Sequence, residues 1–391
     1  MLRSSLAAAS RLKPDLQRQW LGEGNQLRLL IEHGQALNGP LHLWLNGRDN
    51  RGQNLSQQVW HWDPRPRVLA VVPVDQGEQL QLLGHDGLWQ SLTPVLPKLV
   101  NVQPLGDGSA IALVQGGASD QAGPGVTLWR LPLKQGNLSR GPLQEPKAGA
   151  LQPLQQGSVI FAHLSSNRRG DLLVQTSSNT DPLGAITLYR REGGQQRLQH
   201  RAVSGPLELL PEGGGVVVPE PEGLSLQAMP DQPPRRQLLP GSRNLSSFCP
   251  VSGRALLVRH WPDFRRSLEL VEPGQPPRQL WLGDEAVLGS ACERGGERVW
   301  LLLSSWSGRS EIRLLALDRQ GQQLRSRQLS GWEIEPGAPI GFDASRRQLL
   351  LTLRPAGQPQ GTPQPVLIDA DTLLERPLAK PVRLAVWLPA G

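Results

Sequence analysis

The residue types that most often carry chemistry are few in this chain, and they are spread along it. Two cysteines lie in the segments FCPVSGR and ACERGGER, and seven histidines lie at positions 33, 42, 61, 85, 163, 200 and 260. There is no CxxC pair and no Cys/His cluster with the spacing of metal ligands. GxSxG, HExxH and the glycine-rich nucleotide signatures are missing as well. The sequence therefore predicts no catalytic residue, no metal site, no cofactor-binding site and no cofactor.

The elements that must position these residues follow a phrase that the sequence repeats. A turn ending in Gly or Arg precedes an apolar run, and then come an alternating strand, a second turn and a polar strand. The clearest copies are SGRALLVRH with SLELVEPGQPPRQLWL, GERVWLLLSS with EIRLLALDRQGQQLRSRQL, and SRRQLLLTL with PVLIDADTLLERPL. From Gly77 to Arg347 the turn-ending residues recur on average about every 45 residues, which is typical of a four-stranded propeller blade.

Each part of the phrase has the composition expected for one place in a blade. The mixed segment before the turn would be the inner strand, and the apolar run would be buried between neighbouring blades, with Val299, Leu301 and Leu303 in the core. The alternating strand can have one wet face, and the polar last strand would protect the exposed edge. The sequence thus predicts an all-β fold, a single β-propeller of four-stranded blades. Seven blades are favoured, with six or eight as the alternatives.

The two ends of the chain lack the full phrase. Residues 21–66 contain candidate strands, whereas PVRLAVWL at 381–388 is a strand with no phrase after it. A terminal strand often completes the blade that the other terminus begins. We therefore predict a propeller domain over residues 21–391, with 381–388 as the closing strand beside the strands of residues 25–66. Residues 1–20 are predicted to form a flexible or weakly helical basic segment.

Inner strands converge on the channel of a propeller, so equivalent positions of the phrase predict its lining. The candidate channel-lining residues are His163, Cys249, Cys292 and Asp343, alongside Gln103 and Leu210. They form neither a metal shell nor a pair of carboxylates, and we expect a structural role for His163 and a turn-capping role for Asp343. Two buried free thiols are expected at Cys249 and Cys292, with a disulfide as the alternative if their Cα atoms lie within ~7 Å.

Several copies of the phrase resemble the repeats of known propellers. FCPVSGRALLV (248–258) and FDASRRQLLLTL (342–353) resemble the F-S-P-D-G-x-x-L turn of TolB-like and WD-repeat-like propellers. LALDRQGQQLRSRQL and LIDADTLLERPL resemble the strand, Asp, turn and strand that follow it. Val251 or Ala344 stands where Asp is usual, and no Gly-His or Trp-Asp signature closes the blades. The resemblance implies the fold and a habit of binding proteins, and it transfers no catalytic residue.

Charge and hydropathy restrict the partners. The net charge of +7 is dispersed without a run of five basic residues, so no specific nucleic-acid binding is predicted. No stretch approaches the ~18 apolar residues that cross a bilayer, so no transmembrane segment is predicted. Near the start, LAAA is shorter than the ~7–15 apolar residues of a signal-peptide core, and the sequence leaves open whether this N-terminus is complete.

Three functional hypotheses follow. The favoured one is a non-catalytic scaffold, a soluble protein and more readily a monomer than an oligomer, that binds another protein or an assembly intermediate. The first alternative is a propeller-type hydrolase or lyase with its site at the channel mouth, although the missing motifs speak against an enzyme. The second is an exported envelope component resembling TolB. The sequence does not determine the compartment, and it favours the cytoplasm slightly over the periplasm.

Overall fold

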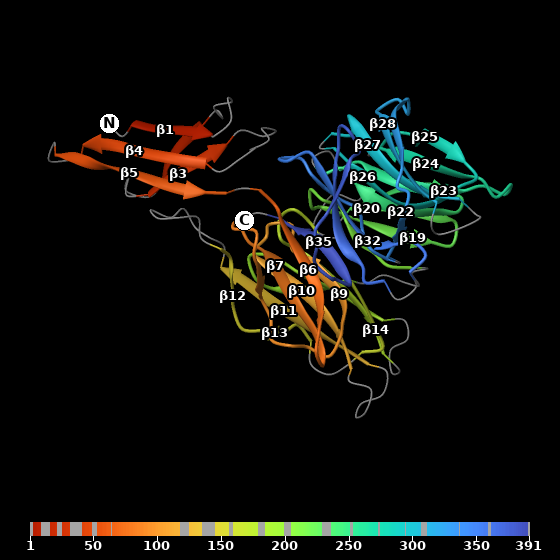
Figure 1. Cartoon of the computed structure of the whole chain (residues 1–391), viewed down its shortest axis with the longest axis horizontal. Coiled ribbons are helices and arrows are strands. Elements are labelled where there is room, and N and C mark those ends of the chain that lie inside the picture. The colour runs from red at the N-terminus through yellow and green to blue at the C-terminus, as the bar shows by residue number, and fades with distance from the viewer. Residues whose placement is uncertain are drawn as a thin grey trace.

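The protein consists of strands and turns, and the described residues of this computed structural model contain no helix (Figure 1). The structure describes residues 3–8, 16–21, 26–31, 41–48, 53–63, 65–117, 125–134, 145–155, 159–178, 184–198, 205–228, 236–250, 253–272, 274–293, 295–305, 311–335, 337–358 and 361–389. Over these ranges, no helix has the length and apolar character that spanning a membrane requires.

Seven antiparallel sheets form the blades of a propeller in this part of the chain. From the channel outward, blade 1 is β35 (Leu384–Leu388), β6 (Arg67–Val74), β7 (Gly77–Leu83) and β8 (Trp89–Ser91), and blade 2 is β9 (Leu99–Pro104), β10 (Ala110–Gly116) and β11 (Val126–Lys134) with β12 (Lys147–Ala148) and β13 (Gln152–Pro153). Blade 3 is β14 (Phe161–Ser166), β15 (Leu172–Ser177), β16 (Ala185–Tyr189) and β17 (Gln195–Leu198), and blade 4 is β18 (Glu208–Leu209), β19 (Gly215–Glu220), β20 (Gly223–Ala228) and β21 (Arg236–Pro240).

The other three blades follow the same order. Blade 5 is β22 (Arg243–Phe248), β23 (Ala255–His260), β24 (Arg266–Val271) and β25 (Arg278–Gly283), and blade 6 is β26 (Ala286–Cys292), β27 (Arg298–Ser304), β28 (Ile312–Asp318) and β29 (Gln323–Gln328). Blade 7 has β30 (Trp332–Ile334) and β31 (Gly341–Asp343) on its inner side, then β32 (Gln348–Pro355), β33 (Gln364–Asp369) and β34 (Glu375–Pro377). This architecture confirms the predicted all-β propeller and the favoured number of seven blades.

The core lies between the blades, and the second strands supply much of it. Along β27, Leu301 packs into a cluster with strands of blade 5, whereas Trp300 packs into a cluster with strands of blade 7. Successive side chains of a strand point to opposite faces, so a strand between two blades must be apolar at every position. Val299, Leu301 and Leu303 are each 0% exposed, which confirms their predicted place in the core.

The ring is closed by the C-terminal strand. β35 runs antiparallel to β6, with Leu384 opposite Val71 and Leu388 opposite Arg67. The closing strand was predicted beside residues 25–66, and in the structure its partner is instead β6, which begins just after that range. RVLAVVPV has the apolar character of a second strand, and the inner place of its blade is taken by β35, while the strands before it pair among themselves.

The strands before blade 1 pair among themselves. β1 (Arg3–Ala8), β4 (Leu41–Arg48) and β5 (Asn54–Trp62) form one sheet, and β2 (Leu16–Leu21) pairs with β3 (Gln26–Ile31). In Figure 1 these red to orange strands lie together beside the propeller. β1 and most of β2 lie in residues 1–20, and each pairs with a strand later in the chain. The flexible or weakly helical character predicted for residues 1–20 stays a prediction. That residues 21–391 form a single domain stays a prediction.

A buried carboxylate holds the segment that enters blade 1. The side chain of Asp63 is shielded from solvent and accepts hydrogen bonds from Nε and Nη2 of Arg65, at 2.8 and 2.7 Å. Its Oδ2 also lies 3.1 Å from Nδ1 of His85, in the turn between β7 and β8. Burial raises the pKa of Asp63, but the hydrogen bonds with His85 and Arg65 outweigh burial and hold that pKa well below its usual range.

We expect Asp63→Asn to lower the free energy of unfolding by about 1–3 kcal/mol at pH 7, because a buried charged hydrogen-bond acceptor is lost. The folded-state pKa of Asp63 lies below its unfolded value of about 3.9, so the carboxylate stabilises the fold above that pH and ceases to do so as the pH falls through the folded-state pKa. The difference between wild type and variant should therefore be constant from neutral pH to about 5 and shrink below about 4.

Urea unfolding at a series of pH values measures this difference, with Asp75→Asn, in the exposed turn between β6 and β7, as the matched control. A gap between wild type and the Asp63 variant that stays the same down to the acid limit would contradict the assignment.

Candidate functional site

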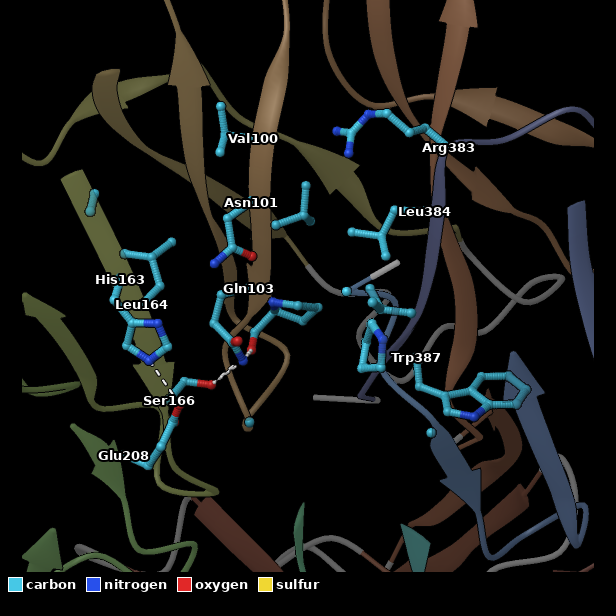
Figure 2. Close-up of a pocket in the computed structure, with 18 of the residues that line it drawn as sticks. Val100, Asn101, Gln103, His163, Leu164, Ser166, Glu208, Arg383, Leu384 and Trp387 are labelled. Atoms are coloured by element: carbon cyan, nitrogen blue, oxygen red, sulfur yellow. Dashed lines mark hydrogen bonds and ion pairs between the residues drawn. The ribbon is translucent and has the colours of Figure 1, made fainter. Parts of the chain in front are cut away.

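A candidate site is a cavity in the channel, with a volume of ≈ 870 Å³. Its walls come from the inner strands β9, β14, β18 and β35 and from the segment around β30 and β31, so five of the seven blades contribute to it. In Figure 2, His163 and Glu208 lie across the cavity from Leu384 and Trp387. The cavity thus has two walls of different chemistry.

One wall of the cavity is apolar. β35 contributes Leu384, Val386 and Trp387, which are half-buried. Leu384 and Val386 share one face of the strand, whereas Trp387 lies on the other face and packs into the cluster between blades 1 and 7. Val100 and Phe161, at the starts of β9 and β14, also line it and are 49% and 46% exposed. Apolar side chains this exposed, gathered at the rim of a cavity, are typical of a binding surface.

The opposite wall is polar, and its groups are bonded to one another across blades. Nε2 of His163 lies 2.7 Å from Oε1 of Glu208, which links blade 3 to blade 4. Gln103 of blade 2 donates from Nε2 to Oγ of Ser166 at 3.0 Å, and the Ser166 hydroxyl donates to the carbonyl of Pro104 at 2.9 Å. These contacts hold the inner strands of blades 2, 3 and 4 in register around the cavity.

The acidic side chains of the lining, Glu208 and Glu335, outnumber the basic one, Arg383. Arg383 already binds Glu78, with Nε 2.5 Å from Oε1, and it also donates to the carbonyl of Leu99. Glu335 has a buried oxygen, Oε2, without a hydrogen-bond partner among the described residues, and Nε1 of Trp387 is a buried donor in the same situation. Two residues of the lining thus each carry a buried polar atom without a partner among the described residues.

A second cavity of ≈ 460 Å³ lies next to it, between blades 4 and 5, and Glu208 lines both. A bulge in β22 shifts its register between Leu245 and Ser247. Oγ of Ser290, on blade 6, lies 2.7 Å from Oγ of Ser246 and 2.7 Å from Oγ of Ser247. Sequence reasoning missed this hydroxyl cluster, and the serine pair in LSSF was the signal that could have indicated it.

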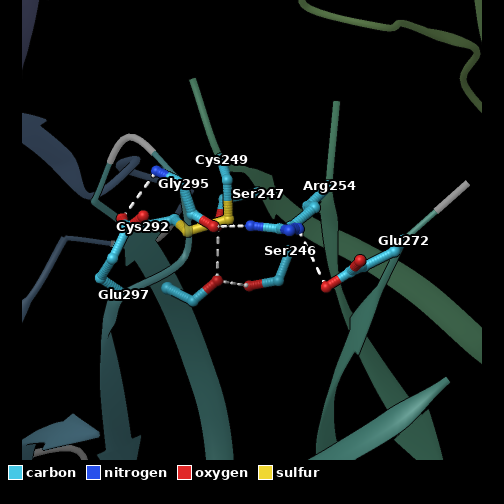
Figure 3. Close-up of a disulfide and its surroundings, with 9 residues drawn as sticks. Ser246, Ser247, Cys249, Arg254, Glu272, Cys292, Gly295 and Glu297 are labelled. Atoms are coloured by element: carbon cyan, nitrogen blue, oxygen red, sulfur yellow. Dashed lines mark hydrogen bonds and ion pairs between the residues drawn. A yellow bond between two sulfur atoms is a disulfide. The ribbon is translucent and has the colours of Figure 1, made fainter. Parts of the chain in front are cut away.

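The two cysteines form a disulfide that joins the inner strands of blades 5 and 6 (Figure 3). Free thiols were expected, and this expectation is wrong. Cys249 and Cys292 hold equivalent places in consecutive blades, and the convergence of inner strands on the channel brings their Cα atoms to 4.9 Å, within the range that a disulfide spans. Beside it, Arg254 donates to the carbonyl of Gly295 and pairs with Glu272, so the same blades are also linked by polar contacts.

Removing the disulfide should lower the free energy of unfolding by about 2–4 kcal/mol, since the bond closes a loop over a sequence separation of 43 and restricts the unfolded chain. The double variant Cys249→Ala with Cys292→Ala, compared with wild type in urea unfolding, measures this loss. Wild type treated with reductant is the control and should approach the stability of the variant. Wild type whose stability does not change with reductant would contradict the prediction.

The predicted channel residues thus lie in three places. His163 lines the cavity, as does Gln103, and the two cysteines are joined in the disulfide between blades 5 and 6. Asp343 is buried at the end of β31, where it accepts hydrogen bonds from the backbone and hydroxyl of Ser345, at 2.8 and 2.6 Å, and from Arg346 at 2.7 Å. Among the described residues, no group of three or more His, Cys, Asp and Glu side chains is placed to hold a metal ion.

No protein-family model and no curated protein matches this sequence. Solved structures do match, over most of the chain. The chain has the fold of a TolB-like and WD-repeat-like β-propeller. The predicted resemblance is confirmed at this level, and the seven four-stranded blades are its basis.

Three of these structures show how similar the matches are in sequence and in fold. An oligogalacturonate lyase in complex with manganese is 13% identical, with a TM-score of 0.53 over 83% of this chain and 96% of that chain. A prolyl endopeptidase is 11% identical, with a TM-score of 0.54 over 96% of this chain and 50% of that one. TolB from Acinetobacter baumannii is 12% identical, with a TM-score of 0.45 over 91% and 81%. At these identities the likeness extends to the fold and not to the activity.

Proposed function

We propose that this propeller is a non-catalytic scaffold that binds a segment of another protein at the mouth of its channel. The observation that carries the proposal is the group of exposed apolar residues around a preformed cavity. Val100, Ile160 and Phe161 are each 46–49% exposed, and the first and last of them line the cavity. Burying such side chains against a partner removes apolar surface from water, which is the main favourable term in protein association.

The polar wall supports binding over catalysis. A hydrolase or lyase needs a base, an acid or a nucleophile that is free to reach its substrate. Here His163 is held by Glu208, and Ser166 is held between Gln103 and the carbonyl of Pro104. These contacts tie strand to strand, as expected of a rigid binding surface.

Photo-crosslinking from the mouth tests the proposal. A photo-reactive phenylalanine analogue at Val100 should form a saturable adduct with one protein in extracts of the native host, and mapping should place the adduct on a single segment of that protein. The same analogue at Leu324, which is 47% exposed on the outer strand β29, is the matched control and should form none. Phe161→Asp should abolish the adduct at Val100, because a carboxylate disrupts an apolar contact. Equal labelling from both positions, or none from either, would contradict the proposal.

An exported location is favoured by a separate observation, the disulfide between Cys249 and Cys292. Disulfides form and persist in oxidising compartments and are rare in the cytosol of mesophiles. This favours the exported envelope component among the hypotheses drawn from the sequence. Trapping of free thiols by an alkylating reagent in intact cells of the host decides it: an export location predicts that both cysteines resist alkylation until they are reduced, whereas two labelled thiols indicate the cytoplasm.

A further inference from the structure

We infer that the channel cavity receives a cationic side chain, a lysine or an arginine, carried by an extended segment of the bound protein, and that Glu335 is its counter-ion. The inference rests on the proposed function and specifies the chemistry of the partner. It follows from the charges, the unpaired oxygen and the apolar wall of the cavity.

The lining of the cavity carries more acidic than basic side chains. Apart from His163, the acidic and basic side chains of the lining are Glu208, Glu335 and Arg383. Both Glu78 oxygens bind Arg383, at 2.5 and 3.2 Å, so this arginine is already neutralised within the protein. Glu208 is in contact with His163, whereas no described group pairs with the buried Oε2 of Glu335. The cavity is therefore locally acidic in a protein whose net charge is +7.

Oε2 of Glu335 is buried without a hydrogen-bond donor among the described residues. A buried acceptor without a donor is unfavourable, and buried acceptors in native structures are satisfied as a rule. An ammonium or guanidinium group supplies both the missing donor and the missing positive charge, and such charge-assisted hydrogen bonds are among the stronger ones in proteins. A neutral or anionic ligand would leave the negative charge of Glu335 without a counter-ion.

The apolar wall of the cavity suits the stem of a long basic side chain. A lysine or arginine side chain buries its methylene stem against apolar surface while its charged end finds a polar partner. Leu384 and Val386 of β35 offer such a surface within the same cavity.

The cavity is large enough for a segment of several residues. A volume of ≈ 870 Å³ exceeds what one side chain needs and falls in the range of sites that enclose ligands of several residues or of drug size. The net positive charge of the whole protein disfavours non-specific attraction of a basic peptide. Selective binding of a basic peptide would therefore report on the cavity itself.

Three capped, fluorescent heptapeptides that differ only at the central residue test this inference. The central residue is lysine, its uncharged isostere norleucine, or glutamate, and the other residues are alanine and leucine. Fluorescence anisotropy with the full-length protein should show that the lysine peptide binds about tenfold or more tightly than the norleucine peptide, as expected for one charge-assisted hydrogen bond. The glutamate peptide should bind most weakly.

Two variants assign the effect to the cavity. Glu335→Gln keeps the shape of the side chain and removes its charge, and it should abolish the preference for lysine over norleucine. Glu192→Gln, in the exposed turn between β16 and β17, makes the same change of charge away from the cavity and should leave the preference unchanged. Thermal unfolding of both variants confirms that they are folded.

The outcomes separate this inference from the proposed function. Equal affinities for the lysine and norleucine peptides, or a lysine preference that survives in the Glu335 variant, overturn the inference even if crosslinking from Val100 succeeds. Absence of binding by all three peptides at about 1 mM, the weak limit of specific recognition, also overturns it. Failure of the crosslinking experiment overturns the proposed function itself, whatever the peptides do.

Discussion

Deletion of residues 384–391 is expected to unfold the propeller as a whole rather than to fray its C-terminus. The deletion removes the backbone pairing of β35 with β6 and the buried side chains of Ala385 and Leu388. It also removes the hydrogen bond that the Ala385 amide donates to Oγ1 of Thr352 at 2.9 Å, which links blade 1 to blade 7. We expect a loss of about 5 kcal/mol or more, comparable with the whole stability of many domains. Circular dichroism should show a transition at lower temperature or none.

Limited proteolysis identifies where the ring opens. Without β35, the inner edge of β6 is unpaired and the cluster around Val68, Ala70 and Val72 is exposed, so early cleavage is expected within residues 67–91. Deletion of residues 390–391 alone is the control and should leave the pattern unchanged. Full protection of residues 67–91 in the longer deletion would show that blade 1 holds without its closing strand, contrary to this expectation.

Leu301→Ala is the second change with a large expected effect, a loss of about 2–5 kcal/mol in the free energy of unfolding. Leu301 lies in the middle of β27 and is fully buried in a cluster that includes Leu256 and Leu268 of blade 5. The shorter side chain loses transfer energy and leaves a cavity that packed strands on both sides cannot fill. Urea unfolding followed by tryptophan fluorescence measures the loss.

Leu324→Ala is the matched control for that substitution. Leu324 belongs to the same blade but lies exposed on the outer strand β29, so the change should stay within about 0.5 kcal/mol of wild type. A cost below about 1 kcal/mol for Leu301→Ala would mean that this side chain is not packed between blades 5 and 6 as the structure has it.

The order of strands within a blade could be predicted because it is written in local patterns. The run VWLLL predicts a strand buried on both faces, and β27 is such a strand. The polar stretch QLRSRQ predicts an outer strand, and β29 is exposed along almost its whole length. Turn residues between them predict tight connections, as found at Gly296, whose φ of 86° is readily adopted by glycine.

The pairing of the ends could be predicted only in part. The strand at 381–388 has no phrase after it, which indicates closure, but the segments before blade 1 also read as strands and offered a partner. Whether a β-like segment pairs with its neighbour or with the far end depends on the rest of the ring. In the structure β4 pairs with β5, and β6 takes the closing strand.

The candidate site was predicted least well, since its contacts join distant parts of the chain. His163 could be placed on an inner strand, but its partner Glu208 lies 45 residues away, and Arg383 binds Glu78 across 305 residues. Glu335 stands between two short inner strands of blade 7 that fit the phrase poorly. No spacing in the sequence marks it as a residue of the cavity.

By itself, the sequence determined the kind of element, its order within each blade and the buried second strands, because period-two patterns and turn residues act over a few neighbouring positions. Only the tertiary structure decided which strand closes the ring, that Cys249 and Cys292 form a disulfide, and that Oε2 of Glu335 is buried without a partner among the described residues. The physical reason is that these features depend on how closely the inner strands of different blades converge at the channel. That convergence is a property of the closed ring, and no short stretch of the chain carries it.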